Sequence, residues 1–191
     1  MSGGLKILRD LAHDTRDEGG NVVRDGTQVF YTTHSPSFLS AGHFNEIFIA
    51  RKTRTDGTVL RFAKAGDFVD DLRARKSIGT TVDKLLLQYR NAYEHTGDTQ
   101  KANEGFFARK IILVEGPTEA LLIPYLLELH DLDLTQEGIS IVRCGGKNEL
   151  DRFYRLYTEF GIPCYYMSFS MVTSAWIQRE IVKLPFRRTA N

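Results

Sequence analysis

The clearest pattern of apolar positions lies in the second half of the chain, where short apolar runs alternate with longer segments of helical period. The runs at 109–116 (RKIILVEG), 138–146 (GISIVRCGG) and 162–167 (IPCYYM) predict buried strands. Between them, 117–132 opens with a proline and 147–161 keeps a helical spacing, so both predict helices. Strands and helices in this alternation predict a parallel sheet with right-handed crossovers. Ligands of such sheets bind at the carboxyl ends of the strands.

The first half of the chain contains shorter elements. Apolar residues on one face predict a short helix at Leu5–His13, and the charged, glycine-rich stretch Asp14–Gly26 predicts a loop. The β-branched and aromatic run TQVFYTTH, Thr27–His34, predicts a strand that Ser35-Pro36 stops. A histidine is therefore expected at the carboxyl end of this strand.

A hairpin and a helical connector join the two halves. Glu46–Phe62 has two apolar-rich runs around Asp56-Gly57, which is the strongest short-range hairpin signal in the chain. From Asp67 to about Arg109 the sequence is charged and helical in character, with a break at Gly97. Its apolar positions fit one face of an amphipathic helix: Val82, Leu85, Leu86, Leu87, Tyr89 and Tyr93.

The composition indicates the class of protein but says little about its function. The 191 residues, 42% of them hydrophobic, can build a core. A formal net charge of +1 gives no bulk attraction to a polyanion, so nucleic-acid contacts would depend on local clusters such as Arg73, Arg75 and Lys76. The two cysteines, Cys144 and Cys164, lack metal-site or disulfide spacing, which predicts a reduced, cytoplasmic setting. Neither a signal peptide nor a membrane span is expected.

Two glutamates follow the first strand of the predicted sheet. Glu115 ends the strand and Glu119 lies in the first turn of the next helix. Gly116 and Pro117 fix a tight turn between them, so both carboxylates can face one spot above the sheet edge. That arrangement suits a hard divalent cation such as Mg²⁺, which takes one or two carboxylates and keeps waters for a phosphate substrate. The helix dipole also favours acidic residues at a helix N-terminus, which is a purely structural explanation for Glu119.

These residues carry a resemblance to a known family. ILVEGPTEALLIPYL, followed by VRCGGKNELDRFYRLYTEFGIPCYY, resembles the start of a TOPRIM domain, the metal-dependent fold of topoisomerases, primases and OLD-family ATP-dependent nucleases. The EGPTE form is most similar to the OLD type. The resemblance runs from about Arg109 to Tyr166. It implies that Glu115 is the catalytic general acid/base or metal-ligand glutamate, that Glu119 is a second metal ligand, and that Mg²⁺ or Mn²⁺ is the cofactor.

Two glycines after the second predicted strand fit the same resemblance. Gly145 and Gly146 fall where the family has a close-packed turn, and a plain loop explains them nearly as well.

The segment upstream resembles the end of an ABC-type ATPase domain. QVFYTTHSPSFLS followed by a hairpin is similar to the place where a strand-terminal histidine contacts the ATP γ-phosphate, and His34 occupies that position. A histidine at a strand end is otherwise most often a structural hydrogen-bonding residue. The chain has no phosphate-binding loop and no apolar strand ending in Asp-Glu before His34, so the resemblance implies ATP binding only in the full-length parent.

The end of the third predicted strand departs from the family. TOPRIM domains end this strand in Asp-x-Asp, and the OLD type is similar to FDGDK, but here the sequence reads CYYMSFSMVTSAW, with no carboxylate before Glu180. Codons for Phe169–Ser174, read from the third base of the Phe169 codon, can spell Phe-Asp-Gly-Asp-Lys. Trp176 followed by Ile177 forces a further Asp in that frame. A frameshift near Met167–Ser168 is therefore the leading hypothesis, and a real, diverged terminus that caps the sheet is the alternative.

The sequence thus predicts an α/β fold: a partial TOPRIM domain with a Rossmann-like parallel sheet, preceded by a partial ABC-type ATPase segment and a helical connector. The expected boundaries are 1–66 for the ATPase segment, 67–108 for the connector, 109–167 for the TOPRIM part and 168–191 for an out-of-frame or diverged tail.

The function expected from these segments is that of a fragment of an ATP-dependent, divalent-metal-dependent DNA endonuclease, a hydrolase that is inactive by itself. The partners would be DNA and, in the parent, a second copy bound through the ATPase region. The alternatives are a non-catalytic fragment that binds DNA or protein, and a topoisomerase- or primase-like TOPRIM protein.

Overall fold

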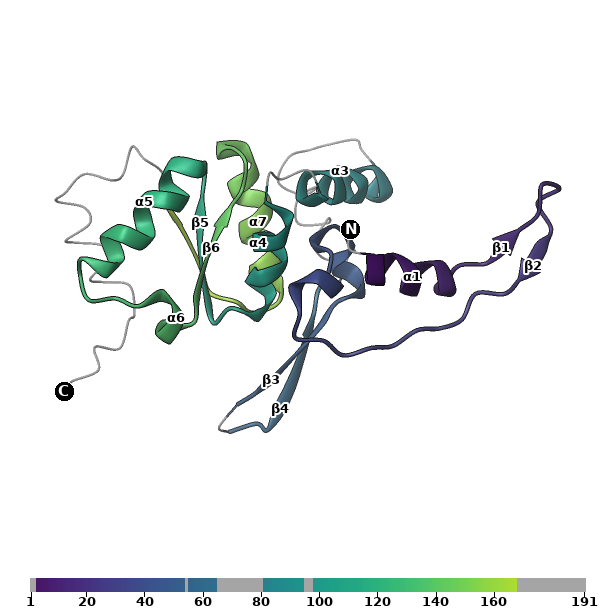
Figure 1. The fold of residues 1–191 in the computed structure, drawn as a ribbon, viewed down its shortest axis with the longest axis horizontal. Helices are drawn as coiled ribbons and strands as arrows, with labels where there is room; N and C mark the ends of the chain where they lie inside the picture. The colour runs from purple at the N-terminus through teal and green to yellow at the C-terminus, as the bar shows by residue number, and fades with distance from the viewer. Residues whose placement is uncertain (1–2, 54, 65–80, 95–97, 168–191) are drawn as a thin grey trace.

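A parallel sheet lies at the centre of the computed structural model, which describes residues 3–53, 55–64, 81–94 and 98–167 (Figure 1). Its three strands are ordered β6-β5-β7: β5 (Lys110–Val114), β6 (Ile139–Arg143) and β7 (Cys164–Met167). Ile112 lies opposite Ile141 on one side and Tyr165 on the other. The strands predicted from the three apolar runs, their parallel direction and the α/β fold class are confirmed.

The two crossover helices cover opposite faces of this sheet. Because β5 is central, the chain passes through α5 (Pro117–Glu128) to β6 on one side, and then through α7 (Lys147–Glu159) to β7 on the other. Alternate residues of β5 enter two separate cores. One core contains Ile112, Val114, Ile123, Leu127 and Met167, and the other contains Ile111, Leu113, Phe153 and Leu156. Burial on both faces is why β5 is a continuous apolar run rather than an alternating one.

The larger core also joins the connector to the sheet. The helices of the connector are α3 (Val82–Glu94), α4 (Thr99–Glu104) and the 3₁₀ helix η3 (Gly105–Phe107). The Tyr93 ring packs edge-on against Phe44 and Phe153, and the Tyr157 hydroxyl donates a hydrogen bond to the Ala102 carbonyl oxygen at 2.6 Å. Residues from all three predicted segments before position 168 therefore share one core. The division of the chain into domains stays a prediction.

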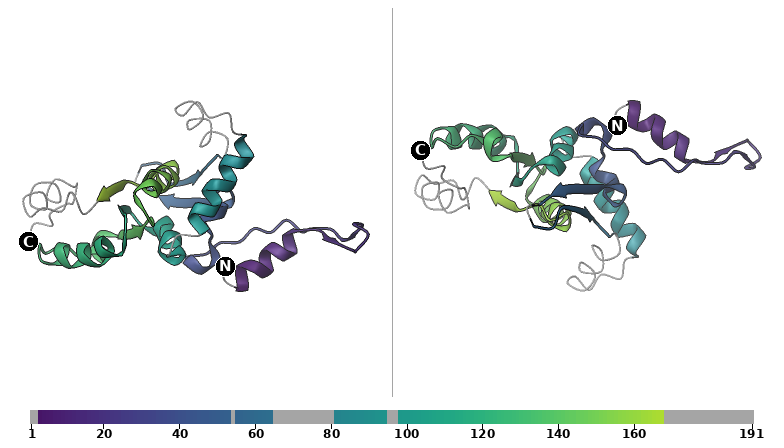
Figure 2. Two further views of the ribbon diagram at one scale, coloured as in Figure 1. Left: turned by 90° about the horizontal axis from the view of Figure 1, so that it is seen from above. Right: turned by 90° about the horizontal axis from the view of Figure 1, so that it is seen from below.

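The N-terminal elements lie beside this core. They are α1 (Gly3–Ala12), β1 (Thr15–Arg16), β2 (Val22–Arg24), η1 (Pro36–Phe38), η2 (Ala41–Glu46), β3 (Phe48–Lys52) and β4 (Thr58–Phe62). The predicted helix and hairpin are confirmed, and Gly57 in the hairpin turn has a φ of 71°. The predicted loop 14–26 contains the short β1–β2 ribbon, which projects away from the sheet (Figure 2). A last short helix, α6 (Leu134–Glu137), precedes β6.

The strand predicted at Thr27–His34 is wrong. These residues have no strand assignment, and Phe30 is 81% exposed. The β-branched and aromatic composition favours an extended backbone, but a strand forms only where a neighbour pairs with its N–H and C=O groups. No described strand pairs with this segment. The predicted tail at 168–191 and the basic cluster Arg73, Arg75 and Lys76 lie outside the described residues.

Candidate active site at the carboxyl end of the sheet

Glu115 stands at the centre of the sheet's carboxyl edge. It follows Val114, the fully buried last residue of the central strand. Val114 lies opposite Arg143 on one side and Met167 on the other, so all three strands end at the same level. Glu115 itself is half-buried. Its carboxylate therefore belongs to the edge where ligands of parallel sheets bind, as the sequence predicts.

Glu119 is fixed by the turn that follows. Gly116 is the N-cap of α5 in an extended conformation, with Pro117 at the first helical position. The Glu119 Oε2 atom accepts a hydrogen bond from the backbone N–H of Gly116 at 3.2 Å, and the residue is only 7% exposed. This contact satisfies a helix-terminal donor, so the structural explanation of Glu119 applies. A carboxylate accepts about four hydrogen bonds or metal contacts, so one such bond does not exclude a second role.

The donor set at this edge suits a hydrated ion rather than a closed metal cage. Glu115 and Glu119 flank the same Gly116-Pro117 turn and offer hard oxygen ligands, which Mg²⁺ and Mn²⁺ prefer. Within the ranges that the structure describes, no group of three or more His, Cys, Asp or Glu side chains could hold a metal ion. The residues present therefore fit an ion that keeps most of its waters and takes at most these two carboxylates.

The glycines after β6 are required by backbone geometry and not by close packing. Gly145 has a φ of 85° and Gly146 a φ of 151°, both of which L side chains rarely adopt. A Cβ atom on either residue would meet no heavy atom within 4 Å. Of the two explanations open at the sequence level, the plain loop is the one that the structure supports.

His34 is not brought to the glutamates. It is exposed, ends the unpaired segment 27–34 and precedes η1, which packs against α1 and α4. The described structure gives no contact between His34 and either Glu115 or Glu119. A role for His34 toward ATP stays a prediction.

Sequence reasoning did not single out Arg143. This half-buried residue ends β6 opposite Val114, and its side chain has no hydrogen bond or ion pair with any described residue. The alternation in ISIVR carries the available signal, because it places Arg143 on the face of Ile139 and Ile141 at the carboxyl end of the strand.

Two other features of the described chain concern reactivity and membranes. Burial raises the pKa of both thiols, to about 12 for Cys164 and further for Cys144. Among the helices that the structure describes, none has the length and the apolar run needed to cross a membrane.

Comparison with known proteins finds a family model and two relatives that are similar to this chain. Residues 106–168 match the family described as overcoming lysogenization defect protein-like, TOPRIM domain. The chain is similar to the OLD nuclease of Thermus scotoductus, with 28% identity over 142 residues, which are 73% of this chain and 24% of that protein. It is also similar to the Old nuclease of Escherichia phage P2, with 24% identity over 160 residues, which are 83% of this chain and 25% of that protein.

The chain spans about a quarter of the length of these curated relatives. The matched range begins in η3, covers the whole parallel sheet with α5 and α7, and includes Glu115 and Glu119. The order of strands and helices and the family match agree with the resemblance drawn from the EGPTE motif. Residues 106–168 thus match an OLD-like TOPRIM domain, and the chain is similar to OLD nucleases over most of its length.

Proposed function

We propose that this chain carries part of the active site of a divalent-metal-dependent DNA endonuclease of the OLD type. The observation that supports this most is the position of Glu115, on the central strand of a parallel sheet at its carboxyl end. The two relatives described above are named as nucleases, which makes hydrolysis of DNA phosphodiesters the reaction to test.

The two glutamates would have different tasks. Glu115, half-buried at the strand end, would bind the ion or move a proton at the scissile phosphate. Glu119 would be the second carboxylate ligand, and the Gly116 N–H would fix its orientation through Oε2. A bound Mg²⁺ or Mn²⁺ would supply Lewis-acid stabilisation of the phosphate and a more acidic water.

We further propose that the chain by itself does not cleave DNA. The sequence has no phosphate-binding loop, and the residues after Met167 contain no Asp-x-Asp. ATP dependence, the contact of His34 with the γ-phosphate and a dimer through the ATPase region would belong to the full-length parent. In this scheme the chain keeps the first carboxylates of the metal site and lacks those that complete it.

A non-catalytic fragment that binds DNA or a partner protein is the second candidate. It is favoured by the small donor set, because the described residues offer two carboxylates and no cluster of three metal-binding groups. The two candidates differ in whether Glu115 and Glu119 bind an ion at all.

A Mn²⁺ titration followed by electron paramagnetic resonance separates the two candidates. We expect one weak site in the wild-type chain that is lost in Glu115→Gln and weakened in Glu119→Gln. The second substitution keeps an amide oxygen that can accept from the Gly116 N–H, so it changes charge more than folding. Glu128→Gln, at the exposed far end of α5, is the matched control.

Absence of Mn²⁺ binding in the wild-type chain would support the non-catalytic candidate and contradict the metal site. A plasmid cleavage assay with Mg²⁺ or Mn²⁺ tests the second part of the proposal. Cleavage by the wild-type chain that Glu115→Ala abolishes would show that the chain is an active nuclease after all.

A further inference from the structure

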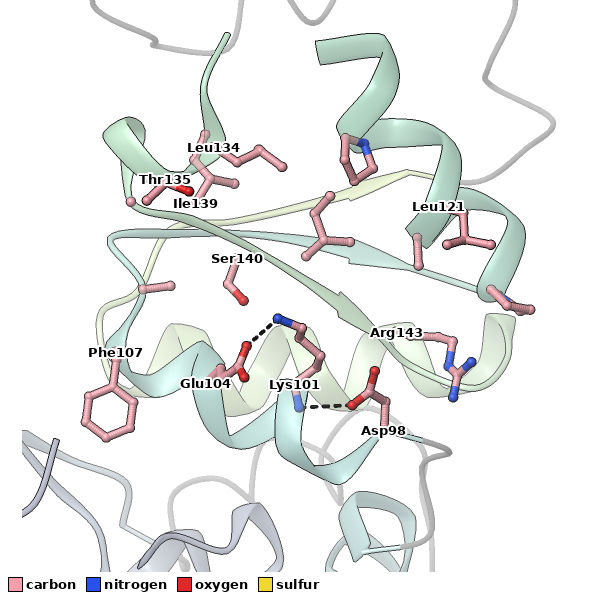
Figure 3. Close-up of a pocket in the computed structure, with 16 residues that line it drawn as sticks. Asp98, Lys101, Glu104, Phe107, Leu121, Leu134, Thr135, Ile139, Ser140 and Arg143 are labelled. Carbon is pink, nitrogen blue, oxygen red and sulfur yellow. Dashed lines mark hydrogen bonds and ion pairs between the residues drawn. The ribbon is translucent and has the colours of Figure 1, made fainter. Parts of the chain in front are cut away.

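A groove of about 720 Å³ runs along the outer edge of β6 (Figure 3). α4 lies on one side of it, and α5 with α6 lies on the other. Ser140 faces α4, while Ile139 and Ile141 pack on the α5 side. The strand edge itself is thus the floor of the groove.

The backbone of β6 presents unused hydrogen-bonding groups to this groove. The Cys144 N–H donates to Val114 O at 2.9 Å, and the Lys110 N–H donates to Gly138 O at 3.4 Å. In a parallel pair, the N–H and C=O groups of alternate residues point to the same neighbouring strand. Because Gly138 and Cys144 bond to β5, the even-numbered residues of β6 do so too. The N–H and C=O groups of Ile139, Ile141 and Arg143 then point outward. Among the described residues, β5 is the sheet neighbour of β6 and no other strand pairs with it.

The four charged residues that line the groove, Asp98, Lys101, Glu104 and Arg143, sum to zero, but they are not all in ion pairs. Lys101 pairs with Glu104, and the Asp98 carboxylate accepts from the Lys101 N–H as the N-cap of α4. Arg143, at the end of the groove, has no such partner in the described chain (Figure 3). An acidic group of an occupant could therefore form an ion pair with Arg143 at that end of the groove.

We propose that the β6 groove binds an extended peptide segment with an acidic residue, which adds as a fourth strand to the sheet. Strand addition is the recognition mode that pairs a row of free backbone groups, and its side-chain contacts alternate between the two walls. The groove favours a single inserted strand over the β6 edge of a second copy. A second copy would bring its own α4 and α5 against the same helices that flank the groove. This proposal does not depend on the nuclease activity proposed above.

Amide hydrogen exchange tests whether the edge is free. In the chain alone, we expect fast exchange at the N–H groups of Ile139, Ile141 and Arg143 and slow exchange at those of Ser140 and Val142. Protection of the three outward amides without added peptide would contradict the proposal, because it would mean that the edge is already paired. Protection that grows with protein concentration would assign the groove to a second copy and would equally overturn it.

Two synthetic peptides probe the groove directly: Ac-Thr-Val-Thr-Val-Glu-NH₂ and Ac-Glu-Val-Thr-Val-Thr-NH₂. We expect one of the two to protect the outward amides and to bind more tightly, depending on whether the added strand is parallel or antiparallel. N-methylation of the alternate residues whose N–H groups face β6 should abolish binding of the peptide. N-methylation of the other alternate residues should leave binding unchanged. Failure of both peptides to bind, or equal loss with both sets of N-methylated residues, would refute strand addition.

Two variants, Arg143→Gln and Lys147→Gln, test the proposed ion pair between Arg143 and the acidic residue of the peptide. Arg143→Gln should lower the affinity of the bound peptide roughly fivefold, the scale of a partly exposed ion pair. The same variant should not change the affinity of a peptide in which Gln replaces Glu. Lys147→Gln removes a nearby exposed positive charge that does not line the groove, and we expect it to leave both affinities unchanged. If both substitutions lowered the affinity for the Glu-containing peptide equally, the proposed ion pair with Arg143 would be wrong.

Discussion

Val114 lies opposite Met167 in the parallel ladder, so the central strand β5 and its neighbour β7 end side by side. Glu115 follows the first of these residues, and the uncharged sequence SFSMVTSAW follows the second. In the TOPRIM resemblance, these two strand ends together form the metal site. The observed register therefore indicates where carboxylates would have to be supplied to complete the proposed site.

Restoring the acidic strand end should strengthen metal binding. The change is Ser170→Asp with Met171→Gly, Val172→Asp and Thr173→Lys, which writes FDGDK from Phe169. Two further carboxylates in the sequence after β7 would raise the number of possible oxygen ligands, so we expect Mn²⁺ to bind at least tenfold more tightly, roughly the effect of one or two added oxygen ligands. The measurement is the same Mn²⁺ titration. A variant with asparagine in place of both new aspartates is the control, and equal binding by the two would contradict the proposed geometry.

The coding DNA should spell the missing motif in another frame. From the third base of the Phe169 codon, we expect the shifted codons to read Phe-Asp-Gly-Asp-Lys, followed by Leu-Asp-Pro near Trp176. The amino-acid sequence alone requires the glycine and the last aspartate in the shifted frame. The other shifted residues depend on which synonymous codons the gene uses, so those codons decide the test. Sequencing the gene decides the matter. Shifted codons that do not encode FDGDK would leave a diverged terminus as the explanation.

The sheet could be predicted from the sequence because its strands are buried on both faces. A continuous apolar run such as Ile111–Val114 has few alternatives to a buried strand, and Pro117 marks the beginning of the next helix. The hairpin was predictable for a local reason as well, since Asp56-Gly57 provides the positive φ that the turn needs. In these elements the local sequence carries the signal, even though the strands of the sheet pair with residues far along the chain.

The features that sequence reasoning missed depend on distant neighbours. Thr27–His34 has the composition of a strand, but pairing decides whether a strand forms, and composition does not encode the partner. The isolation of Arg143 has the same origin, because whether an arginine finds a carboxylate depends on how α4, α5 and β6 are placed. For Glu119 the sequence indicated both a structural and a metal-binding explanation, and the bond to the Gly116 N–H establishes the first while leaving the second as a proposal.

Enlarging Gly105 should destabilise the core through Tyr157. A Cβ atom on Gly105 would lie 2.7 Å from the Tyr157 hydroxyl and 2.8 Å from ring carbons, in a side chain that is fully buried. We expect Gly105→Ala to lower the free energy of unfolding by about 1–3 kcal/mol, as for other overpacked cores. Urea denaturation followed by far-UV circular dichroism measures this change.

The Tyr157 hydroxyl provides the control for that prediction. Tyr157→Phe removes the hydrogen bond to Ala102 O and should cost about 1 kcal/mol. In the double variant the phenylalanine no longer collides through its oxygen, so the combined loss should be smaller than the sum of the single losses. Additivity within about 0.5 kcal/mol would show that the two residues do not interact in this way.

Acid should weaken the contact between α1, η2 and α3. The His43 imidazole beside Glu46, together with Arg9, holds the pKa of the Glu46 carboxyl below its ordinary value of 4.5. A carboxyl whose pKa is lower in the folded state stabilises the fold above its unfolded pKa, and that stabilisation is lost as the pH falls through the folded value. We therefore expect the free energy of unfolding to decrease below about pH 4.5 and to decrease less in Glu46→Gln. Glu128→Gln, at an exposed site, should retain the wild-type slope.

The thiols should be unreactive in the folded protein. Burial raises the pKa of Cys164 from the ordinary value of 9.0 to about 12, so its thiolate fraction near neutral pH falls about a thousandfold. Cys144, which is 1% exposed, is shifted in the same direction by burial. We expect both to react with iodoacetamide at pH 8 only slowly, and to react at the rate of a free thiol after unfolding in urea. The variant Cys164→Ser isolates the signal of Cys144. Labelling of native protein at the unfolded rate would contradict the burial of these two strand-end residues.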